Sequence, residues 1–256
     1  MYGTIIQDAY KKDEALEIIE ALDDLCSPND HYGWASAGLY CFWNYETKEI
    51  LYIGLTLDLT QRFKQHNGYM RTTKTGSKFK NIQEYFKNHE KIGYSILVQS
   101  PLDQPVTAKN IYNLFQFDPS IHELKDFSQE QSKINLKTVE GILIEAYRRY
   151  YGSIPPWNKV EGSKRGREMA SDGNYELVEL FKTDDSSPLV SRFSLRQLSN
   201  EPLYEGIEIF LHGARQIMLS RGLPYGEALE YIKITDSLKR LEQIKSMDYY
   251  NIKLKI

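Results

Sequence analysis

The stretch YIGLTLDLTQRFKQHNG, from Tyr52 to Gly68, decides which fold the sequence predicts. It overlaps the apolar run EILYIGL of residues 49–55, which has the length and composition of a strand. A second apolar run, AGLYCFW at 37–43, precedes it and is separated from it only by the turn-forming segment NYETK. Two strand-like runs joined by so short a turn are typical of a β-hairpin.

A helix is expected directly after this hairpin. Asp58 and Gln61 have the spacing of a capping box, which predicts a helix that continues through His66. The polar and basic segment 67–77 then indicates a loop. By the same periodicity arguments we expect a third strand at 93–98 and further helices at 13–25, 80–89 and 138–151. This order predicts an α/β (α+β) fold, a small central β-sheet with a three-stranded core flanked by helices.

The chain divides into three parts by its patterning. Residues 1–33 are expected to be an N-terminal helical extension, and residues 34–165 the central α/β domain, with an insertion at about 101–136. Residues 170–256 are expected to be a mostly helical region that serves as an accessory, dimerisation or DNA-contact part. Within it we expect a strand at 175–181 and helices near 203–221 and 224–247.

Composition excludes several classes of protein. The 256 residues include only two cysteines, too few for a disulfide framework or for a zinc site built from cysteine alone. The first residues lack the pattern of a signal peptide, and no apolar run approaches the length of a membrane span. We therefore expect a soluble, cytoplasmic protein with no membrane partner.

Charge is unevenly distributed, although the 32 Lys+Arg and 35 Asp+Glu nearly cancel to a net charge of −3. Residues 1–30 hold 8 acidic residues against 2 lysines. Residues 59–94 hold 8 basic against 2 acidic residues, and residues 148–167 hold 6 basic against 1 acidic. Two basic segments are therefore hidden by the overall sum, and a nucleic-acid partner is compatible with this sequence.

Several polar residues are placed so that they could meet at one edge of the predicted sheet. Period-two alternation puts Gly38 and Tyr40 on one face of the first strand, and Tyr52 and Gly54 on one face of the second. Residues four apart on a helix point the same way. Any one of these residues alone is explained by packing, but the whole set suggests a site made of Tyr40, Tyr52, Arg62, His66, Glu140 and Asn158.

The ordered set resembles the GIY-YIG nuclease family. The matching elements are Gly38-Leu39-Tyr40, with leucine in place of isoleucine, then Tyr52-Ile53-Gly54, Arg62, His66, a helix that begins near Glu140, and Asn158. The stretch 52–68 is close to the family's central signature, and the resemblance covers residues 36–160. It implies hydrolysis of DNA phosphodiester bonds with one divalent metal ion, usually Mg²⁺, for which Mn²⁺ can substitute.

The resemblance also implies a role for each residue. Glu140 would be the metal ligand, which fits the preference of Mg²⁺ for carboxylate oxygen and water. Arg62 would hold a phosphate oxygen and stabilise the charge of the transition state. Tyr52 would position water or phosphate, and Asn158 would brace the site or bond the phosphate.

Tyr40 is implied as the general base that takes a proton from the attacking water. A phenol with a pKa near 10 is a poor base at neutral pH, so the site has to lower that pKa. His66, Arg62 and the metal are the neighbouring charges expected to do this.

A second glutamate competes for the role of metal ligand. Glu145 lies 13 residues before Asn158, which is closer to the family spacing than the 18 residues of Glu140. The local sequence EGILI favours Glu140, because it matches how the family continues after its metal carboxylate. Five residues leave side chains about 140° apart around a helix, so both cannot face the site. Glu140 is preferred, and Glu145 is the second choice.

Basic residues on both sides of the site are expected to contact DNA phosphates, although solubilising charge would give the same pattern. The first group follows the signature helix, and the second follows the helix of Glu140. The candidates are Lys64, Arg71, Lys74, Lys78, Lys80, Arg148, Arg149, Lys164, Arg165 and Arg167.

The biological role is less constrained than the chemistry. A restriction-type or defence nuclease is favoured, because we find no zinc-finger spacing or helix-hairpin-helix signature beside the nuclease motifs. The alternatives are a repair, recombination or homing nuclease, a catalytically silent DNA-binding module, and a tyrosine-rich interaction protein. The apolar stripe at 205–219 could serve core packing or a homodimer.

Overall fold

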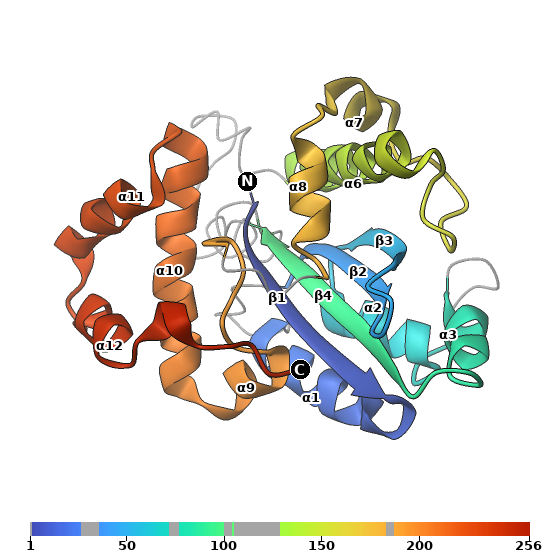
Figure 1. The fold of residues 1–256 in the computed structure, drawn as a ribbon, viewed down its shortest axis with the longest axis horizontal. Coiled ribbons are helices and arrows are strands. Elements are labelled where there is room, and N and C mark those ends of the chain that lie inside the picture. Colours follow the sequence, from blue (N-terminus) through green and yellow to red (C-terminus); the bar gives the residue numbers. More distant parts are fainter. Residues whose placement is uncertain (1, 27–35, 72–76, 100–103, 105–128, 183–186) are drawn as a thin grey trace.

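The computed structural model describes residues 2–26, 36–71, 77–99, 104, 129–182 and 187–256. The sheet and the helices that carry the predicted site all lie within these ranges (Figure 1). Most of the insertion expected at 101–136 lies outside the described residues. The described part of it consists of Gln104 and residues 129–136, and a helix begins at Gln129.

A four-stranded antiparallel sheet forms the centre of the molecule, in the order β1-β4-β2-β3. The predicted hairpin and third strand are confirmed, and a fourth strand at the N-terminus was not expected. The bounds are β1 Tyr2–Lys11, β2 Gly38–Asn44, β3 Ile50–Thr56 and β4 Lys91–Gln99. The sheet therefore has one strand more than the predicted three-stranded core.

The N-terminal segment is not the purely helical extension that we expected. Polar residues interrupt its apolar pattern, but the structure gives their buried side chains partners. Thr4 Oγ1 lies 2.8 Å from His212 Nδ1, the Gln7 amide donates to the Leu180 carbonyl, and Asp8 accepts from Arg196 at 3.0 Å. With these groups paired, the segment can be buried as strand β1.

Helices cover both faces of the sheet (Figure 1). On the face that carries Tyr40, the core is built with helices α1 Ala15–Cys26, α2 Leu59–Asn67 and α3 Phe79–Tyr85. On the opposite face, Leu39, Cys41 and Trp43 pack with helix α6 Gln129–Tyr151 and with Val178 of α8 Asn174–Glu179. The predicted sheet flanked by helices is thus confirmed, with a separate hydrophobic core on each face.

Two predicted elements are corrected on this second face. Helix α6 begins at Gln129 rather than near residue 138. The segment 175–181, expected as a strand, contains most of the short helix α8. Val178 and Phe181 are fully buried, and the three-residue spacing between them fits one side of a helix packed on the sheet.

The C-terminal region is helical, as predicted, but its last long helix is interrupted. The elements are α9 Leu195–Asn200, α10 Pro202–Arg221, α11 Tyr225–Ile232 and α12 Arg240–Ser246. The expected helix 224–247 breaks because the Asp236 carboxylate accepts from the backbone N–H groups of Arg240 and Leu241, starting a new helix. Arg215 of α10 joins this region to the sheet by donating to Thr4 of β1.

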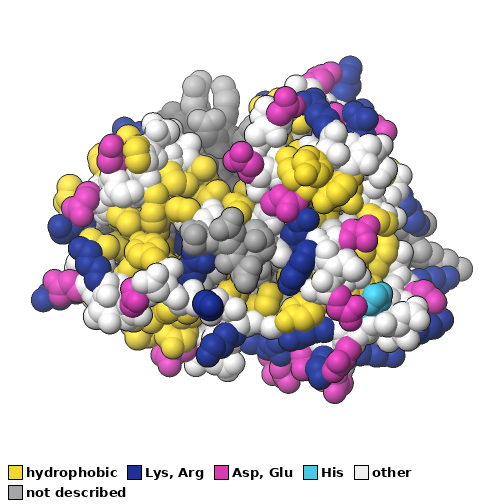
Figure 2. Space-filling view, in the orientation of Figure 1, with side chains coloured by type: hydrophobic (Ala, Val, Ile, Leu, Met, Phe, Trp, Pro, Cys, Tyr) yellow, Lys and Arg dark blue, Asp and Glu magenta, His cyan; other side chains and the backbone are white. Residues whose placement is uncertain are grey.

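Part of the surface is apolar. Figure 2 shows hydrophobic side chains gathered over α10, α11 and α12. Ile234 and Leu238, which follow α11, are 87% and 65% exposed.

In the described part of the chain, none of the helices combines the length and apolar character needed to cross a bilayer. The homodimer suggested by the sequence remains a prediction for the apolar surface over α10, α11 and α12. Both cysteines, Cys26 and Cys41, are buried free thiols.

Candidate active site

The β2–β3 hairpin places the two predicted tyrosines on one face. Tyr40 pairs with Gly54 across the strands, and Phe42 pairs with Tyr52, so these four residues share a face. The Tyr40 and Tyr52 rings lie 5.7 Å apart between centroids. A Cβ atom at Gly54 would lie 2.7 Å from the Tyr40 hydroxyl, so only glycine leaves room for this phenol. The period-two prediction is confirmed.

Helix α2 brings the arginine and the histidine to the Tyr40 hydroxyl. The Asp58 carboxylate accepts from the Gln61 backbone N–H at 2.7 Å and fixes where the helix begins. Arg62 and His66 are four residues apart on this helix and point the same way. Arg62 Nε lies 3.0 Å and His66 Nε2 lies 2.8 Å from the Tyr40 oxygen. The predicted convergence of Tyr40, Arg62 and His66 is therefore present in the structure.

The tautomer of His66 is set by the main chain. The backbone N–H of Lys78 donates to His66 Nδ1 at 2.8 Å, so Nδ1 acts as an acceptor. In a neutral imidazole the proton then lies on Nε2, which donates to the Tyr40 oxygen. That oxygen accepts from His66 and from Arg62 Nε, and both of its lone pairs are occupied.

The ionisation of this cluster differs from the expectation in two respects, because the pKa of Tyr40 is not lowered and His66 is not charged. Burial raises the pKa of Tyr40 well above its ordinary value, and the Arg62 guanidinium only partly offsets this. Burial, together with Arg62 and Lys78, holds the pKa of His66 well below its ordinary value. His66 is thus neutral at pH 7, and the expectation that its charge would lower the pKa of Tyr40 is wrong. Its contribution to a phenolate is a hydrogen bond.

Glu140 of α6 lies near the same cluster. Burial raises the pKa of Glu140 to about 7, offset by the Leu55 backbone N–H and by the charge of Arg62. The Glu140 charge in turn contributes to the raised pKa of Tyr52, for which burial is the largest cause. The half-buried Glu140 carboxylate is thus within electrostatic range of Arg62 and of Tyr52.

The donor set is compatible with a Mg²⁺ ion that keeps most of its waters. Such an ion is commonly held by one or two carboxylates together with substrate phosphates. The Glu140 carboxylate would offer one hard oxygen ligand of this kind. Among the described residues, no group of three or more His, Cys, Asp or Glu side chains is arranged to hold a metal. These residues therefore fit a Mg²⁺ ion held by one carboxylate together with substrate phosphates and water.

Glu145 has a different environment from Glu140. The residue is 4% exposed, and its carboxylate accepts from Arg148 Nε at 2.8 Å and from Arg149 Nε at 2.9 Å. Hydrogen bonds from these arginines lower the pKa of Glu145 to about 2. The structure thus pairs Glu145 with arginines of its own helix, while Glu140 lies within the electrostatic reach of Arg62.

Asn158 braces the edge of the sheet. Its Oδ1 accepts from the Ile53 backbone N–H at 3.0 Å, and its Nδ2 donates to the Ile53 carbonyl at 2.8 Å. Ile53 lies between Tyr52 and Gly54 on β3, an edge strand. Of the two roles implied for Asn158, the structure shows the bracing role.

The predicted DNA-contact residues fall into different environments. Lys64 pairs with Asp23 at 3.6 Å, Lys164 with Glu168 at 3.7 Å and Arg167 with Glu161 at 3.3 Å. Arg148 and Arg149 are held by Glu145. Lys74 lies outside the described residues. Figure 2 shows basic side chains over α7 (Lys164–Met169) mixed with acidic ones. Arg71, Lys80, Lys164 and Arg165 are exposed.

Lys78 was predicted as a surface contact to DNA, and its burial argues against that role. The residue is 7% exposed, and its ammonium donates to the Trp157 carbonyl at 2.5 Å. The same ammonium lies 4.4 Å from the centroid of the Tyr52 ring. Nothing in the basic segment distinguishes Lys78 from its neighbours, so its place in the site could not be predicted from the sequence.

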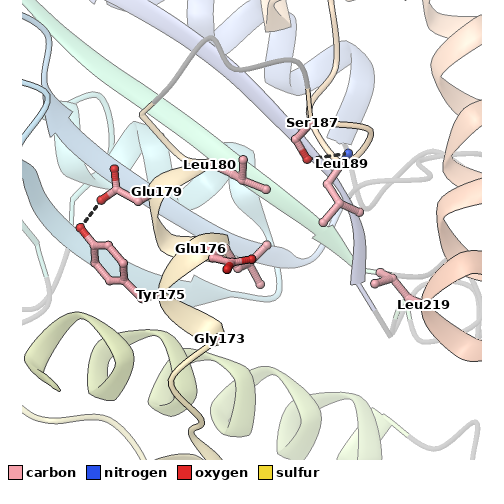
Figure 3. A pocket seen from close by; sticks show the side chains of 9 residues that line it. Gly173, Tyr175, Glu176, Glu179, Leu180, Ser187, Leu189 and Leu219 are labelled. Carbon is pink, nitrogen blue, oxygen red and sulfur yellow. Dashed lines mark hydrogen bonds between the residues drawn. The ribbon is translucent and has the colours of Figure 1, made fainter. Parts of the chain in front are cut away.

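The structure also contains a cavity that the residues of the Tyr40 cluster do not line. It has a volume of about 730 Å³ and is bordered by α8, by Leu189 and by Leu219 of α10 (Figure 3). Tyr175 and Glu179 of α8 contribute to its wall and bond each other. None of its lining residues belongs to the predicted site.

The chain matched no protein-family model, no curated protein and no solved structure. Its function is therefore inferred from the geometry of the Tyr40 cluster and from the order of its motifs.

Proposed function

We propose that this protein is a magnesium-dependent endonuclease that hydrolyses phosphodiester bonds of DNA. The observation that carries the proposal is the Tyr40 oxygen, which accepts from both Arg62 Nε and His66 Nε2, with the Glu140 carboxylate within electrostatic range of the same arginine. Two N–H donors aimed at one buried phenol oxygen stabilise the phenolate relative to the phenol. Burial nevertheless raises the pKa of Tyr40 in the metal-free protein, so in the proposed reaction the charge of a bound Mg²⁺ would have to lower it.

The reaction uses each residue at a defined atom. The Tyr40 phenolate accepts a proton from water, the water oxygen attacks phosphorus, the bond to the leaving sugar oxygen breaks, and that oxygen takes up a proton from solvent to leave as a hydroxyl group. Arg62 uses Nε for Tyr40 and Nη1 for Gln65 and is also hydrogen-bonded to Tyr52, and the donors that remain of its five would bond a non-bridging phosphate oxygen. A Mg²⁺ ion held by Glu140 would neutralise charge on the phosphate and stabilise the leaving oxygen.

The resemblance to GIY-YIG nucleases supports the same chemistry, and the convergence of its matching residues adds geometric support. For the biological role we propose a restriction-type or defence nuclease, on the motif arrangement alone. A repair, recombination or homing nuclease is the alternative, because the same chemistry serves all of these roles.

The experiment is a cleavage assay on a panel of DNA substrates with Mg²⁺, with Mn²⁺ and with EDTA. The panel contains plasmid, linear duplex, branched and single-stranded DNA, and the ends produced are sequenced. Ends at a fixed short sequence would support the restriction role, whereas ends clustered at branches would favour repair or recombination. An absence of metal-dependent cleavage on every substrate would contradict the nuclease proposal.

The non-enzyme alternative is a catalytically silent DNA-binding module. It requires DNA affinity that does not depend on the Tyr40 cluster. A silent module would bind DNA without cleaving it, and its DNA affinity would then be the same in Tyr40→Phe and Glu140→Gln as in the wild type. Cleavage by the wild-type protein that both variants abolish would exclude this alternative.

A further inference from the structure

Lys78 joins three parts of the site that are distant in the sequence. Its backbone N–H donates to His66 of α2, its ammonium faces the Tyr52 ring of β3, and the same ammonium donates to the carbonyl of Trp157. Trp157 immediately precedes Asn158, which clamps β3 at Ile53. One residue thus contacts the histidine, the second tyrosine and the bracing segment.

The burial of this lysine is costly and has to be compensated. A charged ammonium taken out of water loses hydration, which lowers the pKa of Lys78. The Trp157 carbonyl and the face of the Tyr52 ring return part of that free energy as a hydrogen bond and a cation–π contact. Both partners are groups of the site, so the cost is offset only while Tyr52 and the 157–158 segment stay in place.

The surroundings of Lys78 also limit what else it can do. At 7% exposure its side chain offers little surface to a DNA backbone, in contrast with the exposed Lys80 two residues later. Phosphate contacts that steer DNA are made by exposed cations. Lys78 instead faces inward, toward residues that have been assigned to the reaction.

We propose that Lys78 is a positioning residue of the Tyr40 site, which fixes the His66 tautomer through its main chain and holds Tyr52 and the Trp157–Asn158 segment through its ammonium. The inference rests on the proposed nuclease function for its kinetic consequence. It assigns Lys78 no contact with DNA or metal.

The consequence can be separated from DNA binding in steady-state kinetics. Lys78→Met keeps the length of the side chain and removes the charge, so the ring and the carbonyl lose their partner. We expect kcat to fall about tenfold or more, since about 1.4 kcal/mol of lost positioning has that effect, with KM and its salt dependence unchanged. Lys78→Arg, which keeps a cation and donors, should retain more of kcat than Lys78→Met.

The matched control is Lys87→Met. Lys78 immediately precedes helix α3, and Lys87, whose charge is exposed, lies just after its end. Lys87→Met should leave both kcat and KM as in the wild type. If Lys78→Met instead raises KM, flattens the salt dependence and keeps kcat, Lys78 is a phosphate contact and the inference is overturned. Circular dichroism of each variant shows whether the fold is retained.

NMR spectra of the DNA-free protein separate a failure of this inference from a failure of the nuclease proposal. Nitrogen shifts should show His66 protonated on Nε2, and Tyr52 ring signals should move in Lys78→Met but not in Lys87→Met. If wild-type protein cleaves no DNA but these signals behave as stated, the nuclease proposal fails and the positioning contacts stand. Unmoved Tyr52 signals, or a proton on His66 Nδ1, would overturn the inference itself.

Discussion

Tyr40 and Gly54 face each other across the β2–β3 hairpin, and a Cβ atom at residue 54 would lie 2.7 Å from the Tyr40 hydroxyl and 2.8 Å from its Cζ. The phenol is also held by hydrogen bonds with Arg62 and His66, so it cannot yield without breaking them. The glycine is therefore part of what positions the proposed base.

Replacing Gly54 by alanine should both destabilise the fold and reduce cleavage. Overpacking of this kind costs about 1–3 kcal/mol, and it would move the Tyr40 oxygen away from its two donors. The control is Gly213→Ala in α10, where an added Cβ meets no atom within 4 Å and alanine should stabilise the helix by about 0.5–1 kcal/mol. Urea unfolding and plasmid cleavage measure both effects. A Gly54→Ala protein with wild-type stability and cleavage would show that this contact does not position Tyr40.

Replacing Tyr40 by phenylalanine should reduce cleavage about a hundredfold or more and leave DNA affinity unchanged, because the base is lost and the phosphate contacts are not. Stability should fall by about 1–3 kcal/mol, because the buried His66 and the half-buried Arg62 lose the acceptor of their N–H groups. Single-turnover cleavage and thermal unfolding provide the two measurements.

Tyr94→Phe is the matched control for this change. Tyr94 is as buried as Tyr40, but its hydroxyl has no hydrogen-bond partner among the described residues. Removing that hydroxyl should leave cleavage unchanged and stability the same or higher. Equal losses in Tyr40→Phe and Tyr94→Phe would contradict a special role for the Tyr40 oxygen.

The magnesium requirement should depend on pH. The pKa of Glu140 is raised from 4.5 to about 7 in the metal-free protein, and a cation binds only the ionised carboxylate. The Mg²⁺ concentration for half-maximal cleavage should therefore rise about tenfold for each pH unit below 7 and level off above it. A requirement that is constant from pH 5.5 to pH 8.5 would argue against Glu140 as ligand.

The same shift has a consequence for stability in EDTA. Between pH 4.5 and about 7 the folded chain retains a proton on Glu140 that the unfolded chain has lost. This group therefore lowers the free energy of unfolding as pH rises through that interval, and the cost persists above it. Glu140→Gln removes the titration, so its stability relative to wild type should increase over the same interval, as measured by urea unfolding at each pH.

DNA binding should weaken steeply with salt if exposed cations beside the site contact phosphates. Both Arg71, which follows helix α2, and Lys80, in the first turn of α3, are exposed. Replacing either by alanine should reduce the slope of log affinity against log salt by about one, without affecting the chemical step. Fluorescence anisotropy with Ca²⁺ in place of Mg²⁺ measures binding. A flat salt dependence for the wild type would remove the claim that these residues contact phosphates.

Much of the sheet and of the site could be predicted from the sequence because local patterns determine them. Alternation in the hairpin placed Tyr40 and Tyr52 on one face, and the four-residue spacing of Arg62 and His66 placed both toward it. Asp58 fixed the start of α2 as its side chain indicated. These signals depend on residues close in sequence, which is why they were correct.

Long-range pairing explains what the sequence could not reveal. Strand β1 carries Thr4, Gln7 and Asp8, which mask its apolar alternation, and their partners come from residues far along the chain. Lys78 lies in a segment whose net positive charge predicted a contact with DNA. Its burial involves a hydrogen bond with Trp157, which is distant in the sequence. The neutral state of His66 likewise follows from burial, which no sequence pattern reported.

The most direct test of the proposed nuclease compares the cleavage of plasmid DNA by wild-type protein and by three glutamate-to-glutamine variants with Mg²⁺. Glu140→Gln should abolish cleavage. Glu145→Gln should lower stability by about 1–3 kcal/mol, because Arg148 and Arg149 lose a charged partner, but should still cleave below its melting temperature. Glu130→Gln, at the exposed start of α6, should behave as the wild type. Loss of cleavage in Glu145→Gln with full cleavage in Glu140→Gln, or no cleavage by the wild type on any substrate, would contradict the proposed site.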